Sequence, residues 1–256
     1  MVRKAPISPS ENSIITFDSG RHPRAKIGFV LLATEQTIED DMYRLLPEGV
    51  GIHFTRSPIP DCITAETLNN LTNSLSQSAE VLLPDGSLDV ITYACTSGSL
   101  VSGEEAVFQQ LNKGAPNAVA TSLITSVMRA LETLNTKRIV IATPYLDEIN
   151  QMEKDYMQAR GFEVLNIQGF NLDKDSEMVR VTPGSILRFA ANLDEPDAEA
   201  IFISCGALRS IEIIDQLEKL TGKPVVTSNQ AMAWDVMRLA GIQDQIPGYG
   251  VLLNEF

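Results

Sequence analysis

Short apolar runs alternate with longer amphipathic segments along most of the chain, and no other feature constrains its fold as strongly. The runs are rich in Ile and Val and do not alternate strictly, which is typical of buried parallel strands. They are Lys26–Leu32, Val50–Thr55, Leu88–Ala94, Arg138–Ala142, Phe162–Ile167, Ala200–Ser204 and Pro224–Thr227. The helical segments are Thr64–Ala79, Gly103–Asn112, Leu123–Leu134, Asp147–Arg160, Leu208–Leu220 and Ala231–Ala240. This order predicts an α/β protein with helices on both faces of its sheets.

A faint internal repeat divides the chain into similar halves. The run that begins at Lys26 resembles the run that begins at Arg138, and Leu88–Cys95 resembles Glu199–Cys205. Ile27 and Ile139 are 112 residues apart, and the two cysteines are 110 apart. Chance similarity between strands is the alternative explanation. We predict two pseudo-symmetric Rossmann-like lobes, each a mainly parallel sheet flanked by helices, with an active-site cleft between them. The expected division is a tail over 1–25, a first lobe over 26–120 plus 226–256, and a second lobe over 121–225.

Charge and rare residues exclude several classes of function. With 20 Lys plus Arg against 33 Asp plus Glu, the formal net charge is −13, which disfavours nucleic acids and anionic membranes as partners. No apolar stretch approaches the length of a spanning helix, and the polar N-terminus lacks the apolar core of a signal peptide, so we expect a cytoplasmic protein. The two histidines and three cysteines do not have metal-ligand spacing, so no zinc site is expected. His53 is interpreted as a structural residue of a strand and Cys62 as structural or incidental.

Two cysteines stand where predicted strands end. Cys95 is followed by Thr96, Ser97 and a glycine, and a helix is expected from about Gly103; Cys205 is followed by Gly206. Ligands of open α/β sheets bind outside the carboxyl ends of the strands, where turn N–H groups and helix dipoles favour an anion. The same field is expected to lower a thiol pKa. We predict that the two thiols face each other across one cleft, although a buried free cysteine alone is more often a packing residue.

This arrangement suits two kinds of chemistry. One thiol can remove a proton from one face of a small substrate while the other returns a proton to the opposite face. Alternatively, one thiolate attacks while the other thiol handles a proton. Tyr145 follows the strand that begins at Arg138, so its phenol is a candidate for the cleft, with a core position as the equal alternative. The sequence contains no P-loop, dinucleotide fingerprint or recognisable Schiff-base lysine, so the chemistry is expected to need no cofactor and no metal.

Several motifs together resemble the aspartate/glutamate racemase superfamily, and most of all its maleate cis–trans isomerase and arylmalonate decarboxylase branch. Within that branch the chain is most similar to proteins of ectoine utilisation. The motifs are Tyr93-Ala94-Cys95-Thr96-Ser97-Gly98, Ala142-Thr143-Pro144-Tyr145, Ser204-Cys205-Gly206, Gly222–Gln230 and Gly248-Tyr249-Gly250. The likeness extends from about Ala25 to the end of the chain.

The resemblance implies roles for these residues. In the isomerase pattern Cys95 is the nucleophile that adds to a double bond and Cys205 is the second acid or base. The decarboxylase pattern has glycine in place of Cys95 and keeps only the cysteine that matches Cys205. Thr96, Ser97, Tyr145 and Gly206 then correspond to the groups that hold a carboxylate and its enediolate.

One departure from the family bears on the substrate. Maleate isomerases carry an asparagine after the first strand that binds a substrate carboxylate, and here Glu35 is expected to take its place. An acidic side chain repels a carboxylate by about 1 kcal/mol in water and by more when buried. A substrate with an amino group at that end fits better, as in amino acids derived from ectoine.

Three functions remain open from the sequence. The first is an isomerase or racemase that acts on a small carboxylic acid through Cys95 and Cys205, in ectoine catabolism. The second is a decarboxylase of the arylmalonate type that uses Cys205 as proton donor. The third is a ligand-binding module without turnover. The expected partner is a small carboxylic acid, and we expect a homo-oligomer, most simply a dimer.

Overall fold

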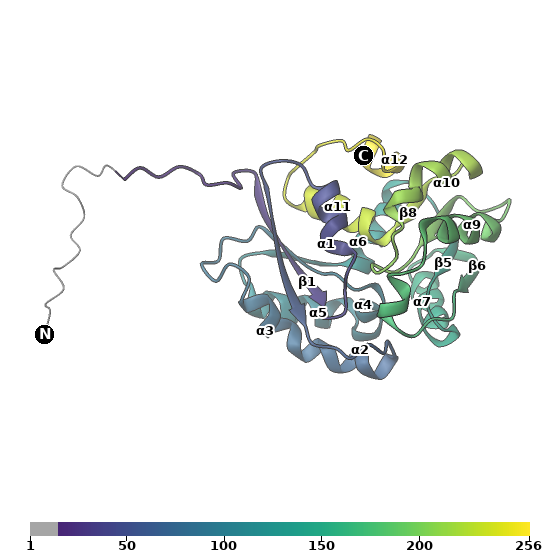
Figure 1. Cartoon of the computed structure of the whole chain (residues 1–256), viewed down its shortest axis with the longest axis horizontal. Helices are drawn as coiled ribbons and strands as arrows, with labels where there is room; N and C mark the ends of the chain where they lie inside the picture. Colours follow the sequence, from purple (N-terminus) through teal and green to yellow (C-terminus); the bar gives the residue numbers. More distant parts are fainter. Residues whose placement is uncertain (1–14) are drawn as a thin grey trace, which may run out of the picture.

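Two four-stranded parallel sheets form the centre of the molecule (Figure 1). The computed structural model describes residues 15–256. The first sheet has the order β2-β1-β3-β4 and the second has the order β6-β5-β7-β8. The strands are β1 Ala25–Leu32, β2 Val50–Ser57, β3 Val90–Tyr93, β4 Val119–Ser122, β5 Arg138–Thr143, β6 Glu163–Gly169, β7 Ala200–Ile203 and β8 Val225–Thr227.

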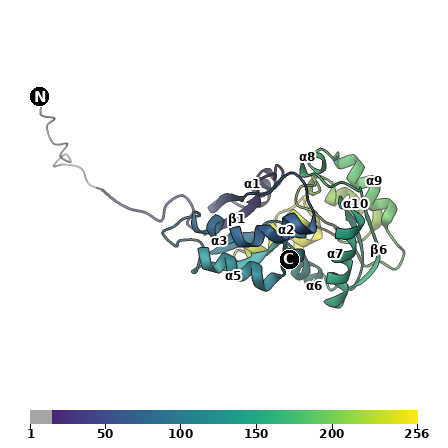
Figure 2. The same ribbon diagram turned by 90° about the horizontal axis from the view of Figure 1, so that it is seen from below.

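Corresponding strands of the two sheets have the same neighbours, which confirms the predicted two-lobed α/β fold. The central pair of the first sheet aligns Ile27 with Val90, and the central pair of the second aligns Ile139 with Ala200. Strands β3 and β7 are buried along their whole length, as expected for central strands covered on both faces. The turned view in Figure 2 shows β1, α3 and α5 at one end and α7, α9 and β6 at the other.

Helices cover both sheets, and their bounds differ from the predicted segments in places. They are α1 Ile38–Leu45, α2 Ala65–Leu71, α3 Leu75–Glu80, α4 Thr96–Ser102, α5 Glu104–Gly114, α6 Leu123–Thr133, α7 Asp147–Ala159, α8 Asp175–Met178, α9 Pro183–Leu193, α10 Ile214–Thr221, α11 Ser228–Leu239 and α12 Gly250–Glu255. Gly161, Gly222 and Gly241 follow helix ends with positive φ, a backbone conformation that glycine adopts without steric cost.

One prediction of local structure is wrong, and one helix was not predicted. The helix expected from about Gly103 is present as α5, but the unpredicted helix α4 precedes it from Thr96, because Cys95 itself caps that helix. The helix after Cys205 does not start at Leu208; a short 3-10 turn, Ile211–Ile213, precedes α10, since the residues before it form the wall of a cavity. Strand β4 and helices α1, α9 and α12 were also not predicted from the sequence. Residues 119–122, where a lobe boundary was expected, form the edge strand β4 of the first sheet.

Helix α11 lies between the lobes and packs against α6, α1 and α12. Its Asp235 is buried and accepts hydrogen bonds from Thr121 of β4 and from Ser126 and Arg129 of α6, each at 2.9–3.0 Å. The division of the chain into lobes at 120/121 and 225/226 remains a proposal, with α11 beyond the second point.

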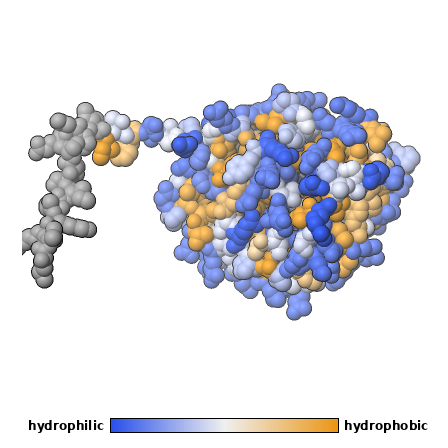
Figure 3. Space-filling model, in the orientation of Figure 1, coloured by the Kyte–Doolittle hydropathy of each residue, from blue (hydrophilic) through white to orange (hydrophobic). Residues whose placement is uncertain are grey.

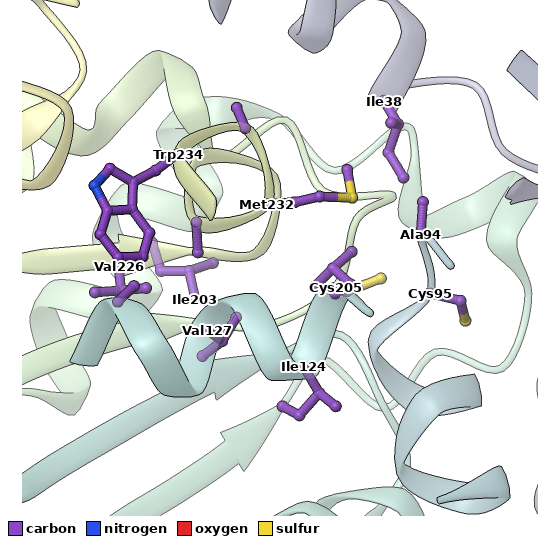
Figure 4. Packing of buried hydrophobic residues seen from close by; sticks show 14 of the residues in the cluster. Ile38, Ala94, Cys95, Ile124, Val127, Ile203, Cys205, Val226, Met232 and Trp234 are labelled. Atoms are coloured by element: carbon purple, nitrogen blue, oxygen red, sulfur yellow. The ribbon is translucent and has the colours of Figure 1, made fainter. Parts of the chain in front are cut away.

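The two lobes share one hydrophobic core, and the visible face of the surface is largely hydrophilic (Figure 3). Figure 4 shows part of the core, in which Cys205 lies among Ile38, Ile124 and Met232. Within residues 15–256, no helix combines the length and the apolar composition that a membrane crossing requires.

Candidate active site

A small cavity of about 20 Å³ lies at the carboxyl ends of the central strands. It is lined by every residue predicted for the site, namely Glu35, Cys95, Thr96, Ser97, Tyr145, Cys205 and Gly206. It is also lined by Leu32, Ile63, Ala94, Asp175 and Ala207. A larger, open hollow beside α10 and α12 contains no cysteine, serine or histidine, so the small cavity is the better candidate for nucleophilic or proton-transfer chemistry.

The Cys95 side chain is fixed at the start of a helix. Cys95 is the N-cap of α4, and its Sγ accepts a hydrogen bond from the backbone N–H of Gly98 at 3.2 Å. The hydroxyl of Ser97 lies 3.7 Å from the same sulfur. Ser99 donates to the Cys95 carbonyl at 2.6 Å, which holds the backbone of the cap. The sulfur therefore faces hydrogen-bond donors of its own loop.

Cys205 has an unusual backbone conformation after the equivalent strand. Its φ is +91°, which side-chain-bearing residues rarely adopt. The next carbonyl, that of Gly206, accepts a hydrogen bond from Asn229 of α11 at 2.8 Å. A Cβ on Gly206 would lie 2.8 Å from the terminal methyl group of Ile38, so a larger residue would require the Ile38 side chain of α1 to move. In Figure 4 the sulfur of Cys205 is directed toward the side on which Cys95 lies.

The expectation that the turn would lower the thiol pKa is wrong for both cysteines. Burial raises the pKa of Cys95 to about 11, although the Gly98 N–H and the Ser97 hydroxyl oppose this. Burial and the nearby Asp175 carboxylate also raise the pKa of Cys205 well above its ordinary value. Desolvation of a thiolate therefore outweighs the few donors, and burial keeps both cysteines as neutral thiols at neutral pH.

Tyr145 is buried in the cavity wall rather than at the rim. The turn that carries it is held from both sides: Thr143 Oγ1 accepts from the Tyr145 N–H at 3.1 Å and donates to Asn150 of α7 at 2.5 Å. Burial and the neighbouring Cys205 raise the pKa of Tyr145, so the phenol is a permanent donor. Across the cavity the Thr96 hydroxyl pairs with Ser228 of α11 at 3.1 Å, whereas Ser97 remains near Cys95.

Glu35 is tied to the start of α1 by one of its two oxygens. Oε1 accepts backbone N–H bonds from Gln36, Thr37 and Ile38 at 2.9, 2.5 and 3.0 Å. Oε2 makes no hydrogen bond with the described residues. Burial raises the pKa of Glu35, and the three N–H donors limit this shift. The side chain is thus both a helix cap and part of the cavity wall.

Asp175 is the site residue that the sequence reading missed. It begins the short helix α8, reaches the cavity from the second lobe, and accepts a hydrogen bond from the Thr34 hydroxyl. Burial raises its pKa, and its charge in turn acts on both thiols. No local pattern marks it, because an aspartate at the start of a helix is common for reasons of the helix dipole alone.

The cavity wall is acidic and contains no basic side chain. Glu35 and Asp175 both line it, and no Lys, Arg or His does. His53 lies in β2 and Cys62 in the loop before α2, both outside the cavity. Within residues 15–256, no group of three or more His, Cys, Asp or Glu side chains is arranged to hold a metal ion.

Comparisons with known proteins agree with this architecture. A family model described as arylmalonate decarboxylase matches residues 51–253. Maleate isomerase of Nocardia farcinica is 26% identical over 242 residues, which cover 90% of this chain and 96% of that protein. Arylmalonate decarboxylase of Bordetella bronchiseptica is 27% identical over 240 residues, with 90% and 96% covered.

Solved structures show the same fold. Maleate cis–trans isomerase of Nocardia farcinica bound to TRIS superposes with a TM-score of 0.84 at 23% identity, over 90% of this chain and 98% of that one. A liganded double mutant of arylmalonate decarboxylase superposes with a TM-score of 0.80 at 25% identity, over 91% and 100%. A cysteine-to-serine mutant of the Nocardia enzyme, with a TM-score of 0.84 at 23% identity over 91% and 99%, carries a covalently bound succinylcysteine intermediate.

Proposed function

Because the chain belongs to the arylmalonate decarboxylase family, we propose that it is a cofactor-independent isomerase or racemase that acts on a small carboxylic acid through Cys95 and Cys205. The observation that carries this proposal is that two thiols, from equivalent strand ends of two similar lobes, line one cavity. A decarboxylase of the arylmalonate type needs only one of them, so the pair favours two-thiol chemistry.

In the isomerase form of the reaction, the Cys95 thiolate adds to a carbon of a double bond conjugated with the substrate carboxylate. The electron pair of the double bond moves into that carboxylate, which becomes an enediolate, and the new single bond can rotate. Collapse of the enediolate re-forms the double bond and expels the thiolate. The covalent intermediate in the Nocardia farcinica structure supports an attack of this kind.

In the racemase form, one cysteine removes the proton on the carbon next to the carboxylate while the other delivers a proton to the opposite face. Hydroxyls of Thr96, Ser97 and Tyr145 and the backbone at Gly206 are the proposed donors to the carboxylate and to the enediolate. Both routes need a thiolate, which burial disfavours. Positive charge brought by the substrate would offset this cost.

We also propose that the substrate carries an ammonium group. Glu35 and Asp175 line the cavity without a basic partner on its wall, and Glu35 has one oxygen free of protein donors. An ammonium between these carboxylates would neutralise them and lower the thiolate cost, whereas a second carboxylate would be repelled. The proposed place in ectoine breakdown depends on the sequence resemblance alone.

Arylmalonate-type decarboxylation is the second candidate, because a decarboxylase of this type is 27% identical over nearly the whole chain. In that reaction CO₂ leaves, the enediolate is held by the same donors, and Cys205 protonates it. Decarboxylation should then survive Cys95→Gly, whereas two-thiol chemistry should not.

Turnover of unsaturated acids, amino acids and substituted malonates in heavy water, followed by NMR, tests these proposals. We expect isomerisation, or deuterium at the carbon beside the carboxylate without CO₂ release, and a loss of at least about 100-fold in Cys95→Ser and Cys205→Ser. Cys62→Ser, outside the cavity, is the matched control and should keep full activity.

The same panel tests the ammonium group through matched pairs such as aspartate and succinate, which differ only in that group. Glu35→Gln and Asp175→Asn should reduce the preference for the amino compound in binding assays. If both cysteines can be replaced without loss of turnover, the two-thiol proposal is wrong; if only binding is found, the protein is a ligand-binding module.

A further inference from the structure

Tyr93 is a fully buried tyrosine whose hydroxyl has no partner that satisfies ordinary hydrogen-bond geometry. It is the last residue of β3 and precedes Cys95 by two positions. A buried tyrosine normally finds a partner for its O–H, and a phenylalanine would fill the same apolar space without that requirement. The hydroxyl therefore needs an explanation from its surroundings.

The backbone of Gly98 connects this hydroxyl with the sulfur of Cys95. A Cβ at Gly98 would lie 2.2 Å from the Tyr93 Oη and 3.0 Å from the Cys95 Sγ, so both atoms lie against the same side of one glycine. The N–H of Gly98 donates to that sulfur at 3.2 Å. The phenol and the sulfur are thus neighbours at a position where a methyl group would collide with the phenol.

We propose that Tyr93 is a positioning residue whose O–H donates a hydrogen bond to the Cys95 thiolate when the thiolate forms. Together with the Gly98 N–H and the Ser97 hydroxyl it gives the sulfur three donors from its own lobe. The neutral thiol needs few donors, which accounts for a hydroxyl without an ideal partner in the resting site. The importance of Tyr93 for turnover rests on the proposed role of Cys95.

The titratable groups around Cys95 are consistent with this arrangement. Burial and the Asp175 carboxylate of α8 raise the pKa of Cys95, whereas the Gly98 N–H, the Ser97 hydroxyl and the nearby Tyr93 hydroxyl lower it. Burial and the same contact with Cys95 raise the pKa of Tyr93, so its phenol keeps its proton. Tyr145 of the second lobe lines the cavity with Cys205, and the charge of Cys205 raises the pKa of Tyr145 more than the charge of Cys95 does. Tyr93 is therefore the phenol associated with Cys95, and Tyr145 is the phenol associated with Cys205.

The test is the rate at which iodoacetamide alkylates Cys95 in the full chain between pH 6 and 10, followed by mass spectrometry of the Cys95 peptide. Thiolate is the reacting form, so the rate reports the thiolate fraction. A hydrogen bond to a charged group contributes about 1.5 kcal/mol or more, and one pKa unit is about 1.4 kcal/mol. We expect Tyr93→Phe to reduce the Cys95 rate about tenfold at every pH below its titration.

Two controls separate this effect from loosened packing. The Cys205 peptide of the same samples should react at an unchanged rate, because its phenol is Tyr145. Tyr156→Phe removes a hydroxyl of α7 outside the cavity and should leave both rates unchanged. An unchanged or faster Cys95 rate in Tyr93→Phe would overturn the proposal, as would an equal change at both cysteines.

Gly98→Ala provides a second route to the same result, since its methyl group would displace the Tyr93 hydroxyl from the sulfur. Like Tyr93→Phe, this variant should reduce the rate of Cys95 alkylation. The outcome is separable from that of the proposed function: slower alkylation with turnover that survives Cys95→Ser would retain the role of Tyr93 and reject that of Cys95. An unchanged alkylation rate in Tyr93→Phe, together with a loss of turnover in Cys95→Ser, would retain the role of Cys95 and reject that of Tyr93.

Discussion

Cys205 has a side chain at a backbone position where glycine is the natural choice. Its φ of +91° lies in a region that costs a side-chain-bearing residue on the order of 1–3 kcal/mol. Such strain is retained where the surrounding structure holds it and where the side chain has a use. Here Asn229 fixes the following carbonyl, and the strained residue presents a thiol to the cavity.

We therefore predict an inverted order of stability at this position. Cys205→Gly should have a larger free energy of unfolding than Cys205→Ala, by about 1 kcal/mol, because glycine adopts positive φ without steric cost. Equilibrium urea unfolding measures both. Cys95, with φ −144°, is the matched control: there Cys95→Gly should be the less stable variant by about 0.5–1 kcal/mol. The same order at both cysteines would contradict the strain at Cys205.

The site residues that could be predicted from the sequence share one property. Their position directly after a predicted strand is enough to locate them at the site. Cys95, Tyr145 and Cys205 follow the carboxyl ends of parallel strands, and those ends meet wherever such a sheet forms. Asp175 could not be found in this way, because it reaches the cavity from the connection between β6 and α9 of the second lobe, which lies against Thr34 of the first lobe. The role of Tyr93 could not be predicted either, because a tyrosine in an apolar run is normally interpreted as a core residue.

At the scale of elements, the long and strongly patterned segments were predictable and the short ones were not. Strand β4 has only four residues, only the last two of them are buried, and it forms the edge of its sheet. Helix α4 has the composition of a turn, with Thr96, Ser97 and Gly98 in its first turn; the Cys95 cap and tertiary packing make it helical. Tertiary context thus overrides weak local propensity at the place where the cavity is built.

Helix α7 supplies a buried carboxylate behind Cys205, and this gives an element-scale prediction. Glu153 accepts a hydrogen bond from Ser204 at 2.7 Å, its second oxygen is unpaired, and burial raises its pKa to about 7. Between about pH 4.5 and pH 7 the unfolded chain ionises Glu153 while the folded protein does not. The protonated Glu153 therefore favours the folded state fully below about pH 4.5, and this contribution is lost as the pH rises to about 7. Above that pH the stability does not change further because of Glu153.

Glu153→Gln should remove that loss. Relative to the wild type, its free energy of unfolding should improve between pH 4 and pH 8 by on the order of 2–3 kcal/mol. Chemical denaturation at a series of pH values measures the difference. Glu148→Gln, an exposed change on the same helix, should show no comparable trend. Parallel pH curves for wild type and Glu153→Gln would mean that the carboxylate is not protonated in the folded state.

At the scale of the whole molecule, the repeat in the sequence predicted two lobes and a cleft, but not what covers the cleft. The segment 173–176 of the second lobe, here called the clasp, bonds to the first lobe at three points. The Asp173 carbonyl accepts from the Ile63 N–H at 2.8 Å, Thr34 donates to Asp175, and Asp61 accepts from both donors of Ser176 at 3.0 and 2.5 Å. The dimer and the cytoplasmic location expected from the sequence stay predictions.

Because two of these bonds depend on the exposed Asp61, its removal should open the clasp without disturbing the core. We expect Asp61→Ala to speed hydrogen exchange of the Ser176 amide and alkylation of both cavity cysteines severalfold, since both thiols lie beneath the same cover. The thermal unfolding midpoint should change little, as for most surface substitutions. Asp85 is the matched control: it holds the N–H and hydroxyl of Ser87 in the same way, in a loop away from the cavity. Asp85→Ala should leave both alkylation rates unchanged, and equal rates in Asp61→Ala and wild type would show that the lobes stay closed over the cavity without this contact.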